Sequence, residues 1–296
     1  MPSTREIQRR IRPVKNIAQI TKAMQMVASS KMRRAQERVE QARPYAEQIR
    51  ALVSRLANTT GEDIGSGASL LRQRPVHNIG FVVITPDRGL CGALPSNINR
   101  KAMSSALEEQ KKLGQDGSRP EIDFVAVGRK GRDFIVRSQL HMLAEFVNYG
   151  DRPSLGDARA ISQVAVDAFQ KGEVDIVFLV YAKFVNTVTQ VPTAIQLLPV
   201  QPPEEENNEH QSVEYEYEPD AASIFAELLP RYVDVLVYQS LLEAVASQYS
   251  AQMVAMKNAT DSAGELLEDL TLAYNKARQA SITTQILEVV SGSGAL

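Results

Sequence analysis

A glycine-free stretch opens the chain at residues 4–56, with the sequence TREIQRRIRPVKNIAQITKAMQMVASSKMRRAQERVEQARPYAEQIRALVSRL. Steps of four and three residues in turn, beginning at Ile7, select positions that are all apolar except Thr21 and Gln25. This first seam consists of Ile7, Ile11, Val14, Ala18, Thr21, Gln25, Ala28, Met32, Ala35, Val39, Ala42, Ala46, Ile49, Val53 and Leu56. An apolar repeat of 3.5 residues held this long is typical of a helix in a left-handed coiled coil.

A second stretch of this kind lies near the other end of the chain, where residues 221–290 contain Gly264 as their only glycine. The same stepping gives a second seam that is apolar except at Gln239 and Thr260. It consists of Leu228, Tyr232, Val235, Gln239, Leu242, Ala246, Tyr249, Met253, Met256, Thr260, Ala263, Leu267, Leu270, Tyr274 and Ala277. The first seam is rich in alanine and the second in larger side chains, so the two seams can interdigitate.

The ends of both helices have local support. Ser3 and Glu6 form a capping box at the start of the first, and Asp220 is a candidate cap for the second. Pro13, Pro44 and Pro230 interrupt the pattern, and we expect kinks there rather than helix ends.

The middle third predicts a Rossmann-like α/β domain. Short β-rich runs at residues 77–85, 122–127, 142–147 and 174–184 alternate with helical segments, which favours a parallel sheet. Residues 188–200 could add a further strand, with Pro192 suggesting an edge position. Residues 201–220 contain eight acidic residues and no Lys or Arg, which is typical of a solvated linker.

The predicted organisation is a helix at 1–58, an α/β domain at 76–200, an acidic linker at 201–220 and a second helix at 221–290. If both helices leave one domain and pair, they must be antiparallel. At 1.5 Å per residue they are ~80 Å and ~105 Å long, so the C-terminal helix should extend ~25 Å beyond its partner. The extending tip is apolar, which predicts that something outside the chain surrounds it.

Bulk properties exclude several classes of protein. A net charge of −2 argues against a surface built throughout for nucleic acid, and one cysteine cannot form an internal disulfide. The three histidines lie far apart in sequence, so we expect no metal and no cofactor. The longest apolar stretch is far shorter than the ~20 residues that cross a bilayer, so we expect no direct membrane insertion.

The first helix carries two further surface features. Residues 1–56 hold 13 Lys and Arg against four Glu, which suits an acidic partner. Ile17, Ile20, Met24 and Val27 form an apolar stripe off the seam, which packs either on the middle domain or on a partner. A basic coiled-coil module for nucleic acid or anionic membrane is an alternative function, but it leaves the apolar C-terminal tip unexplained.

The central turn is defined as Asp87, Arg88, Gly89, Leu90, Cys91 and Gly92, and it follows a predicted strand. A ligand loop or a nucleophilic Cys91 is one interpretation, yet no dinucleotide fingerprint or phosphate-loop signature is present. A tight turn with a small buried thiol is the other. We therefore expect no catalytic residue in this chain.

Three segments resemble signatures of the gamma subunits of F-type ATP synthase. They are residues 17–36, IAQITKAMQMVASSKMRRAQ, the central turn, and residues 256–279, MKNATDSAGELLEDLTLAYNKARQ. The resemblance covers essentially the whole chain and implies a central rotor of the bacterial type. It also implies that the chain is non-catalytic and couples ion-driven rotation to ATP synthesis in a hexamer of alpha and beta subunits.

The resemblance also implies roles for single residues. Arg278 and Gln279 match a polar pair that contacts a beta-subunit loop, Met24 lies where the family's first helix meets an acidic beta-subunit lever, and Arg88 is a further candidate for a beta contact. The tip would turn inside an apolar sleeve, and its contact residues would include Ile282, Ile286, Leu287 and Val290.

Partners and location follow from the same resemblance. The α/β domain would rest on the membrane c-ring and hold the epsilon subunit, on the cytoplasmic face of a bacterial plasma membrane. The chain departs from the family at Pro13, where a small polar residue is expected. It also lacks the two-cysteine insert of chloroplast relatives, so we expect no thiol regulation of that kind.

Overall fold

The computed structural model describes residues 3–60, 66–113, 119–201 and 220–293. The chain divides into two compact units. Unit 1 combines Met1–Ser30 with Gln252–Leu296, and unit 2 is Lys31–Ala251. The acidic segment predicted as a linker lies outside the described residues, apart from Gln201 and Asp220.

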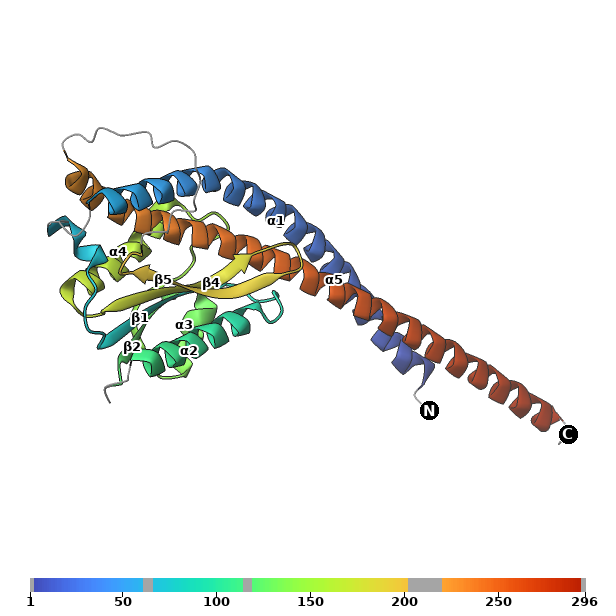
Figure 1. Ribbon diagram of the computed structural model, residues 1–296. Helices are drawn as coiled ribbons and strands as arrows, with labels where there is room; N and C mark the ends of the chain where they lie inside the picture. The colour runs from blue at the N-terminus through green and yellow to red at the C-terminus, as the bar shows by residue number, and fades with distance from the viewer. Residues whose placement is uncertain (1–2, 61–65, 114–118, 202–219, 294–296) are drawn as a thin grey trace. The chain divides into compact units, whose positions relative to one another are not determined.

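A five-stranded sheet forms the centre of unit 2, in the order β3-β2-β1-β4-β5 (Figure 1). β1 pairs in parallel with β2 and β4, and β2 pairs in parallel with β3. β5 runs antiparallel to β4 at the edge and contains Pro192, as predicted, because proline has no N–H for a second neighbour. The strands are β1 Asn78–Ile84, β2 Glu121–Val127, β3 His141–Phe146, β4 Ile176–Phe184 and β5 Gln190–Leu198.

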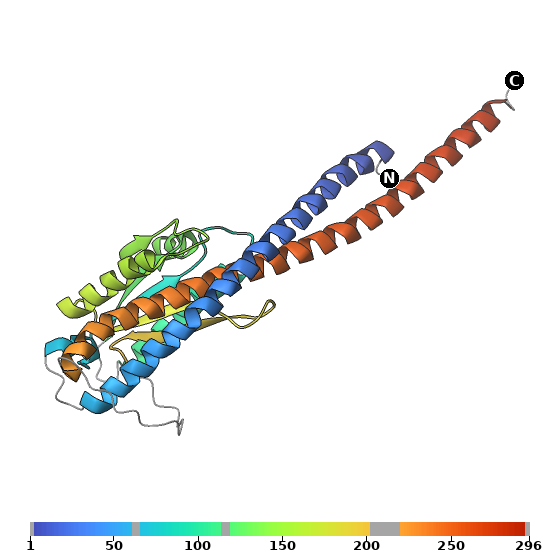
Figure 2. The ribbon, with the colours of Figure 1, turned by 90° about the horizontal axis from the view of Figure 1, so that it is seen from above.

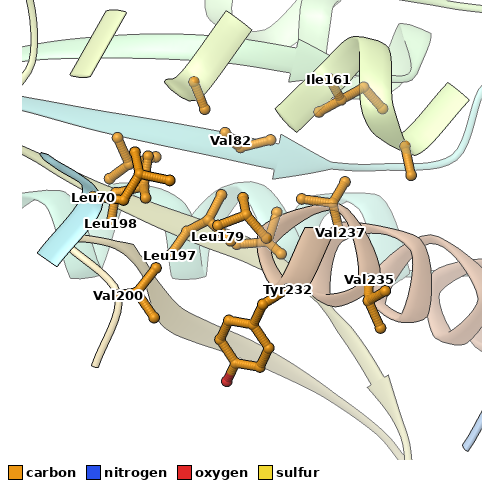
Figure 3. Close-up of a cluster of buried hydrophobic side chains, with 14 of the residues drawn as sticks. Leu70, Val82, Ile161, Leu179, Leu197, Leu198, Val200, Tyr232, Val235 and Val237 are labelled. Carbon is orange, nitrogen blue, oxygen red and sulfur yellow. The ribbon is translucent and has the colours of Figure 1, made fainter. Parts of the chain in front are cut away.

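Apolar side chains cover both faces of the sheet. Along β1, Phe81 and Val83 join one buried cluster, whereas Val82 and Ile84 join the other, because successive strand residues point to opposite faces. The first cluster includes residues of α2 and α3, and the second includes residues of α4 and α5, four of which are labelled in Figure 3. The shorter helices are η1 Ser66–Leu71, α2 Leu94–Leu113, α3 Arg129–Arg137 and α4 Leu155–Lys171.

The two long helices are α1 Thr4–Thr60, with 57 residues, and α5 Ala221–Ser293, with 73 residues. Both are continuous through Pro13, Pro44 and Pro230, so the expectation that proline would not end them is confirmed. The predicted caps also form. Ser3 Oγ accepts a hydrogen bond from Glu6 N at 3.3 Å, and Asp220 Oδ1 accepts one from Ser223 N at 2.8 Å.

Within unit 2, α5 is a core helix rather than only one member of a pair. Every residue from Leu241 to Ser247 is buried, including positions well away from the second seam. Phe225, Leu229 and Val233 belong to the same buried cluster as Val82 of the sheet and Val53 of α1. The sheet and α1 both contribute to this cluster, so both cover α5.

Candidate functional site

The paired helices of unit 1 follow the two predicted seams closely. From Arg5 to Ala28 of α1, every seam position is buried or half-buried, and Met24 is the one other residue of that range that is not exposed. From Met256 to Ala277 of α5, every seam position is again buried or half-buried. Thr21 and Thr260, one polar member from each seam, form a hydrogen bond of 2.8 Å between their hydroxyls. The prediction of a coiled coil between the chain's ends is confirmed.

The C-terminal tip, residues 278–290, extends past its partner helix, and all of its residues are exposed. Figure 2 shows the red end of α5 continuing beyond the first residues of α1. Ile282 is 47% exposed, Ile286 58%, Leu287 63%, Val289 72% and Val290 61%. Thirteen helical residues measure ~20 Å, close to the expected extension. An apolar surface of this kind on a helix is characteristic of a binding surface.

The structure also places the predicted polar pair and Met24 in unit 1. Arg278 and Gln279 are exposed and begin the tip, one residue after the last seam position, Ala277. Ile17, Ile20 and Val27 are more than half exposed, and Met24 is half-buried. Packing of this stripe on the middle domain or on a partner stays a prediction.

The central turn lies in unit 2, between β1 and α2, and hydrogen bonds hold it to the start of α3. Asp87 Oδ1 accepts from Arg129 N at 3.0 Å, and Pro86 O accepts from Lys130 N at 3.2 Å. Leu90 has φ 67° and Gly92 has φ 60°, which is the left-handed conformation of a tight turn. Arg88 and Leu90 are exposed, so the turn presents these two side chains outward.

Cys91 is buried and has no features of a nucleophile. Its Sγ lies 3.7 Å from Arg88 O, and burial, the largest influence, raises the pKa of the thiol. A nucleophilic cysteine needs a stabilised thiolate, and this environment disfavours it. The interpretation as a turn with a small buried thiol fits the geometry better than the enzymatic one.

A network centred on Thr85, which sequence reasoning missed, fixes the end of β1 beside this turn. Gly131 N donates to Thr85 Oγ1 at 2.7 Å, and Tyr149 Oη donates to Thr85 O at 2.7 Å. Gly128 has φ 97°, and a Cβ there would lie 1.9 Å from Thr85 O. A Cβ at Gly131 would likewise lie 2.9 Å from Thr85 Oγ1, so the two glycines, Gly128 and Gly131, are the sequence signals that could have indicated this contact.

The described residues meet neither the requirements of a metal site nor those of a membrane-spanning helix. Within that part of the chain, no group of three His, Cys, Asp or Glu residues is placed to hold a metal ion. Among the same residues, no helix has the length and apolar character needed to cross a membrane.

Comparisons with known proteins agree on one family. The family model described as ATP synthase matches residues 3–296. An ATP synthase gamma chain of Roseiflexus sp. (strain RS-1) is 48% identical, with 100% of this chain and 99% of the relative covered. The gamma chain of Desulfitobacterium hafniense (strain DSM 10664 / DCB-2) is 47% identical over the full length of both chains.

Solved structures support the same conclusion. A chain from the central stalk and c-ring structure of the Tetrahymena thermophila mitochondrial ATP synthase matches with a TM-score of 0.56 and 25% identity. That match covers 81% of this chain and 99% of the other. A chain of the Euglena gracilis mitochondrial enzyme shares the fold, with a TM-score of 0.64, 16% identity and coverage of 99% and 94%.

These comparisons give no support to the alternative of a basic module for nucleic acid or anionic membrane. In the same chain, the two long helices pair along the seams predicted from the sequence, and burial raises the pKa of the Cys91 thiol. The chain therefore belongs to the gamma subunits of ATP synthase, the non-catalytic rotor subunits of the central stalk.

Proposed function

We propose that the C-terminal tip of α5 turns inside an apolar sleeve formed by a hexamer of alpha and beta subunits. The observation that supports this proposal is an exposed apolar surface on a helix that extends beyond its partner. Its residues are Ile282, Ile286, Leu287 and Val290. Apolar contacts are non-directional, so an apolar sleeve can hold such a tip while the tip rotates. The absence of charge at these four positions fits a bearing better than a fixed contact.

Polar residues at the start of the tip are suited to carrying force. Arg278 and Gln279 are the first two residues of the tip, and both are exposed. Their guanidinium and amide groups can form directional hydrogen bonds with a beta-subunit loop. Met24, half-buried beside the exposed Ile20 and Val27, provides an apolar contact for an acidic lever on a beta subunit, where the basic surface of α1 supplies the attraction.

Rotation changes nucleotide affinity in the beta subunits through differential binding. Each orientation of an asymmetric shaft fits one set of beta conformations better than the others, so torque is converted into changes of site affinity. Arg88, exposed on the central turn, is a further contact for a beta subunit. Ion flow through the membrane ring drives the rotation, and ATP is formed in the hexamer.

The α/β domain of unit 2 serves as the foot in this proposal. It rests on the membrane c-ring and holds the epsilon subunit. The complex stands on the cytoplasmic face of a bacterial plasma membrane, consistent with the bacterial relatives at 47–48% identity. The lack of a spanning helix among the described residues fits attachment through these partners.

Reconstitution with alpha and beta subunits tests the proposal. A probe attached to the α/β domain should rotate in one direction during ATP hydrolysis. Deleting residues 277–296 should reduce assembly and torque while leaving the thermal stability of the isolated chain nearly unchanged, because residues 278–290 are all exposed. Equal loss of torque and of chain stability would instead assign the tip an ordinary packing role.

A further inference from the structure

A polar cluster joins three separate elements of unit 2 at one carboxylate, that of Asp151. Asp151 lies in the loop between β3 and α4, and its Oδ2 accepts a hydrogen bond from Lys31 Nζ of α1 at 2.5 Å. The same ammonium lies 3.4 Å from Tyr249 Oη of α5 and 5.2 Å from the centre of its ring. Arg38 of α1 donates to the backbone oxygen of Asp151 at 3.2 Å. One loop residue thus holds both long helices.

The electrostatic environment keeps this cluster charged. Burial alone would raise the pKa of Asp151, but hydrogen bonds from Lys31 and Tyr249, together with the charges of Lys31 and Arg88, outweigh it. The pKa of the carboxyl therefore lies below its ordinary value. For Tyr249, burial first and Asp151 second raise the pKa of the hydroxyl, which remains a neutral donor. Asp151 is ionised and Tyr249 protonated at neutral pH.

The position of the cluster along the chain gives it mechanical importance. Lys31 is the first residue of unit 2 on α1, and Ala251, two residues after Tyr249, is the last on α5. Both helices are therefore tied to the α/β domain where each leaves unit 2. The seam residues next to the cluster on α1, Met32 and Ala35, are apolar and buried. Apolar contacts resist separation but have no preferred direction, whereas charge-assisted hydrogen bonds fix the position of one helix against another.

We propose that Asp151 is a positioning residue for torque transmission, which locks α1 and α5 to each other and to the α/β domain through Lys31 and Tyr249. The inference rests on the proposed rotor function. It adds that the contacts of Asp151 with Lys31 and Tyr249 transmit torque between the α/β domain and the paired helices. Without these hydrogen bonds, α1 and α5 slip against the α/β domain when torque is applied. The angle between the α/β domain and the paired helices inside the hexamer is then no longer fixed.

The test uses the assembled complex of alpha, beta and this chain, with a probe on the α/β domain. The complex hydrolyses ATP and the probe rotates in steps. The measured quantity is the width of the distribution of probe angles while the probe rests between two steps. Asp151→Asn removes the carboxylate charge, Lys31→Met removes the cation, and Tyr249→Phe removes only the hydroxyl. Each should broaden the distribution, whereas Lys31→Arg, which keeps the cation, should restore a width close to that of the unaltered chain.

The matched control is Arg159→Gln, which removes an ion pair between α4 and α5, Arg159 Nε to Asp234 Oδ2 at 3.2 Å, without involving α1. Its angular width should equal that of the unaltered chain. The inference is overturned if Asp151→Asn and Tyr249→Phe leave the width unchanged, or if Arg159→Gln broadens it as much. Tyr249→Phe is the mildest variant, and it decides the matter if the charge variants fail to assemble. Absence of rotation in the unaltered complex would refute the rotor proposal itself, a separate outcome.

Discussion

Thr260 and Thr21 meet across the paired helices of unit 1, with their hydroxyl oxygens 2.8 Å apart. Thr21 Oγ1 also lies 3.0 Å from Ile17 O, one turn back along α1. Thr260 can therefore donate to Thr21 while Thr21 donates to its own helix, which satisfies both hydroxyls. Because two hydroxyls that face each other in a mostly apolar seam lose their hydrogen bond when the helices shift, this contact fixes the register of the two helices.

Replacing either threonine with valine tests this register contact. Each single substitution should lower the free energy of unfolding of the chain by about 0.5–1.5 kcal/mol, since one hydroxyl loses its partner across the seam. The double substitution should cost less than the sum of the two, because it leaves no hydroxyl unpaired. Urea unfolding of the four chains measures the coupling, and strict additivity would contradict the contact.

Substitutions in the C-terminal tip should weaken binding to alpha and beta subunits without lowering the stability of the chain. Ile282→Asp with Ile286→Asp should change the free energy of unfolding by less than about 0.5 kcal/mol, because both side chains are largely exposed. The same pair should weaken assembly with alpha and beta subunits, because it places charge against an apolar sleeve. Gln285→Glu, a charged change at an exposed polar position of the same tip, is the control. Co-purification yield and thermal melting provide the two measurements, and a large loss of stability would contradict the exposure.

Glu243 of α5 gives unit 2 a pH-dependent stability. Its side chain is 8% exposed, Oε1 accepts from Gln239 Nε2 at 3.3 Å, and Oε2 is buried with no hydrogen-bond partner among the described residues. Burial raises the pKa of the carboxyl above 4.5. The charge of Lys183, hydrogen bonds from Gln239 and the Phe184 backbone, and the charge of Arg43 oppose this rise. The folded chain therefore holds this proton more tightly than the unfolded chain does. The contribution of Glu243 therefore increases the free energy of unfolding as the pH falls through the folded pKa. The increase is complete below the ordinary pKa of 4.5, where the unfolded chain is protonated as well.

Glu243→Gln removes this titration. The variant should be more stable than the unaltered chain near neutral pH, by about 1 kcal/mol, and the difference should shrink as the pH falls. Urea unfolding at a series of pH values measures it. Glu227→Gln, at an exposed position of the same helix, should show little such dependence. A Glu243→Gln difference that stays constant with pH would refute the assignment.

Gly128 should tolerate no side chain. Gly128→Ala should lower the free energy of unfolding by more than about 3 kcal/mol, because it combines a left-handed residue with a clash against the backbone of Thr85. Gly264→Ala is the control, since a Cβ there meets nothing within 4 Å in a helical segment, and it should raise stability by up to about 1 kcal/mol. Thermal melting compares the two, and similar effects of both changes would contradict the contact at residue 128.

The sequence by itself determined the elements with a clear period or a strong local signal. The seam from Ile7 to Leu56 predicted burial along α1, because a 3.5-residue repeat leaves one face for a partner. Pro192 predicted an edge strand, because it lacks an N–H, and the excess length of the C-terminal helix predicted an exposed apolar tip. Each of these signals lies within one segment and can be recognised without knowing what packs against it.

The tertiary structure alone decided what joins separate segments. The seam did not reveal that α5 is buried on all sides from Leu241 to Ser247, because a 3.5-residue count marks one face and cannot show that a sheet covers the others. Nor could it place Asp151 beside Lys31 and Tyr249, which are 120 and 98 residues away along the chain. Such contacts depend on where the folded backbone brings distant side chains, and no local period or propensity encodes that.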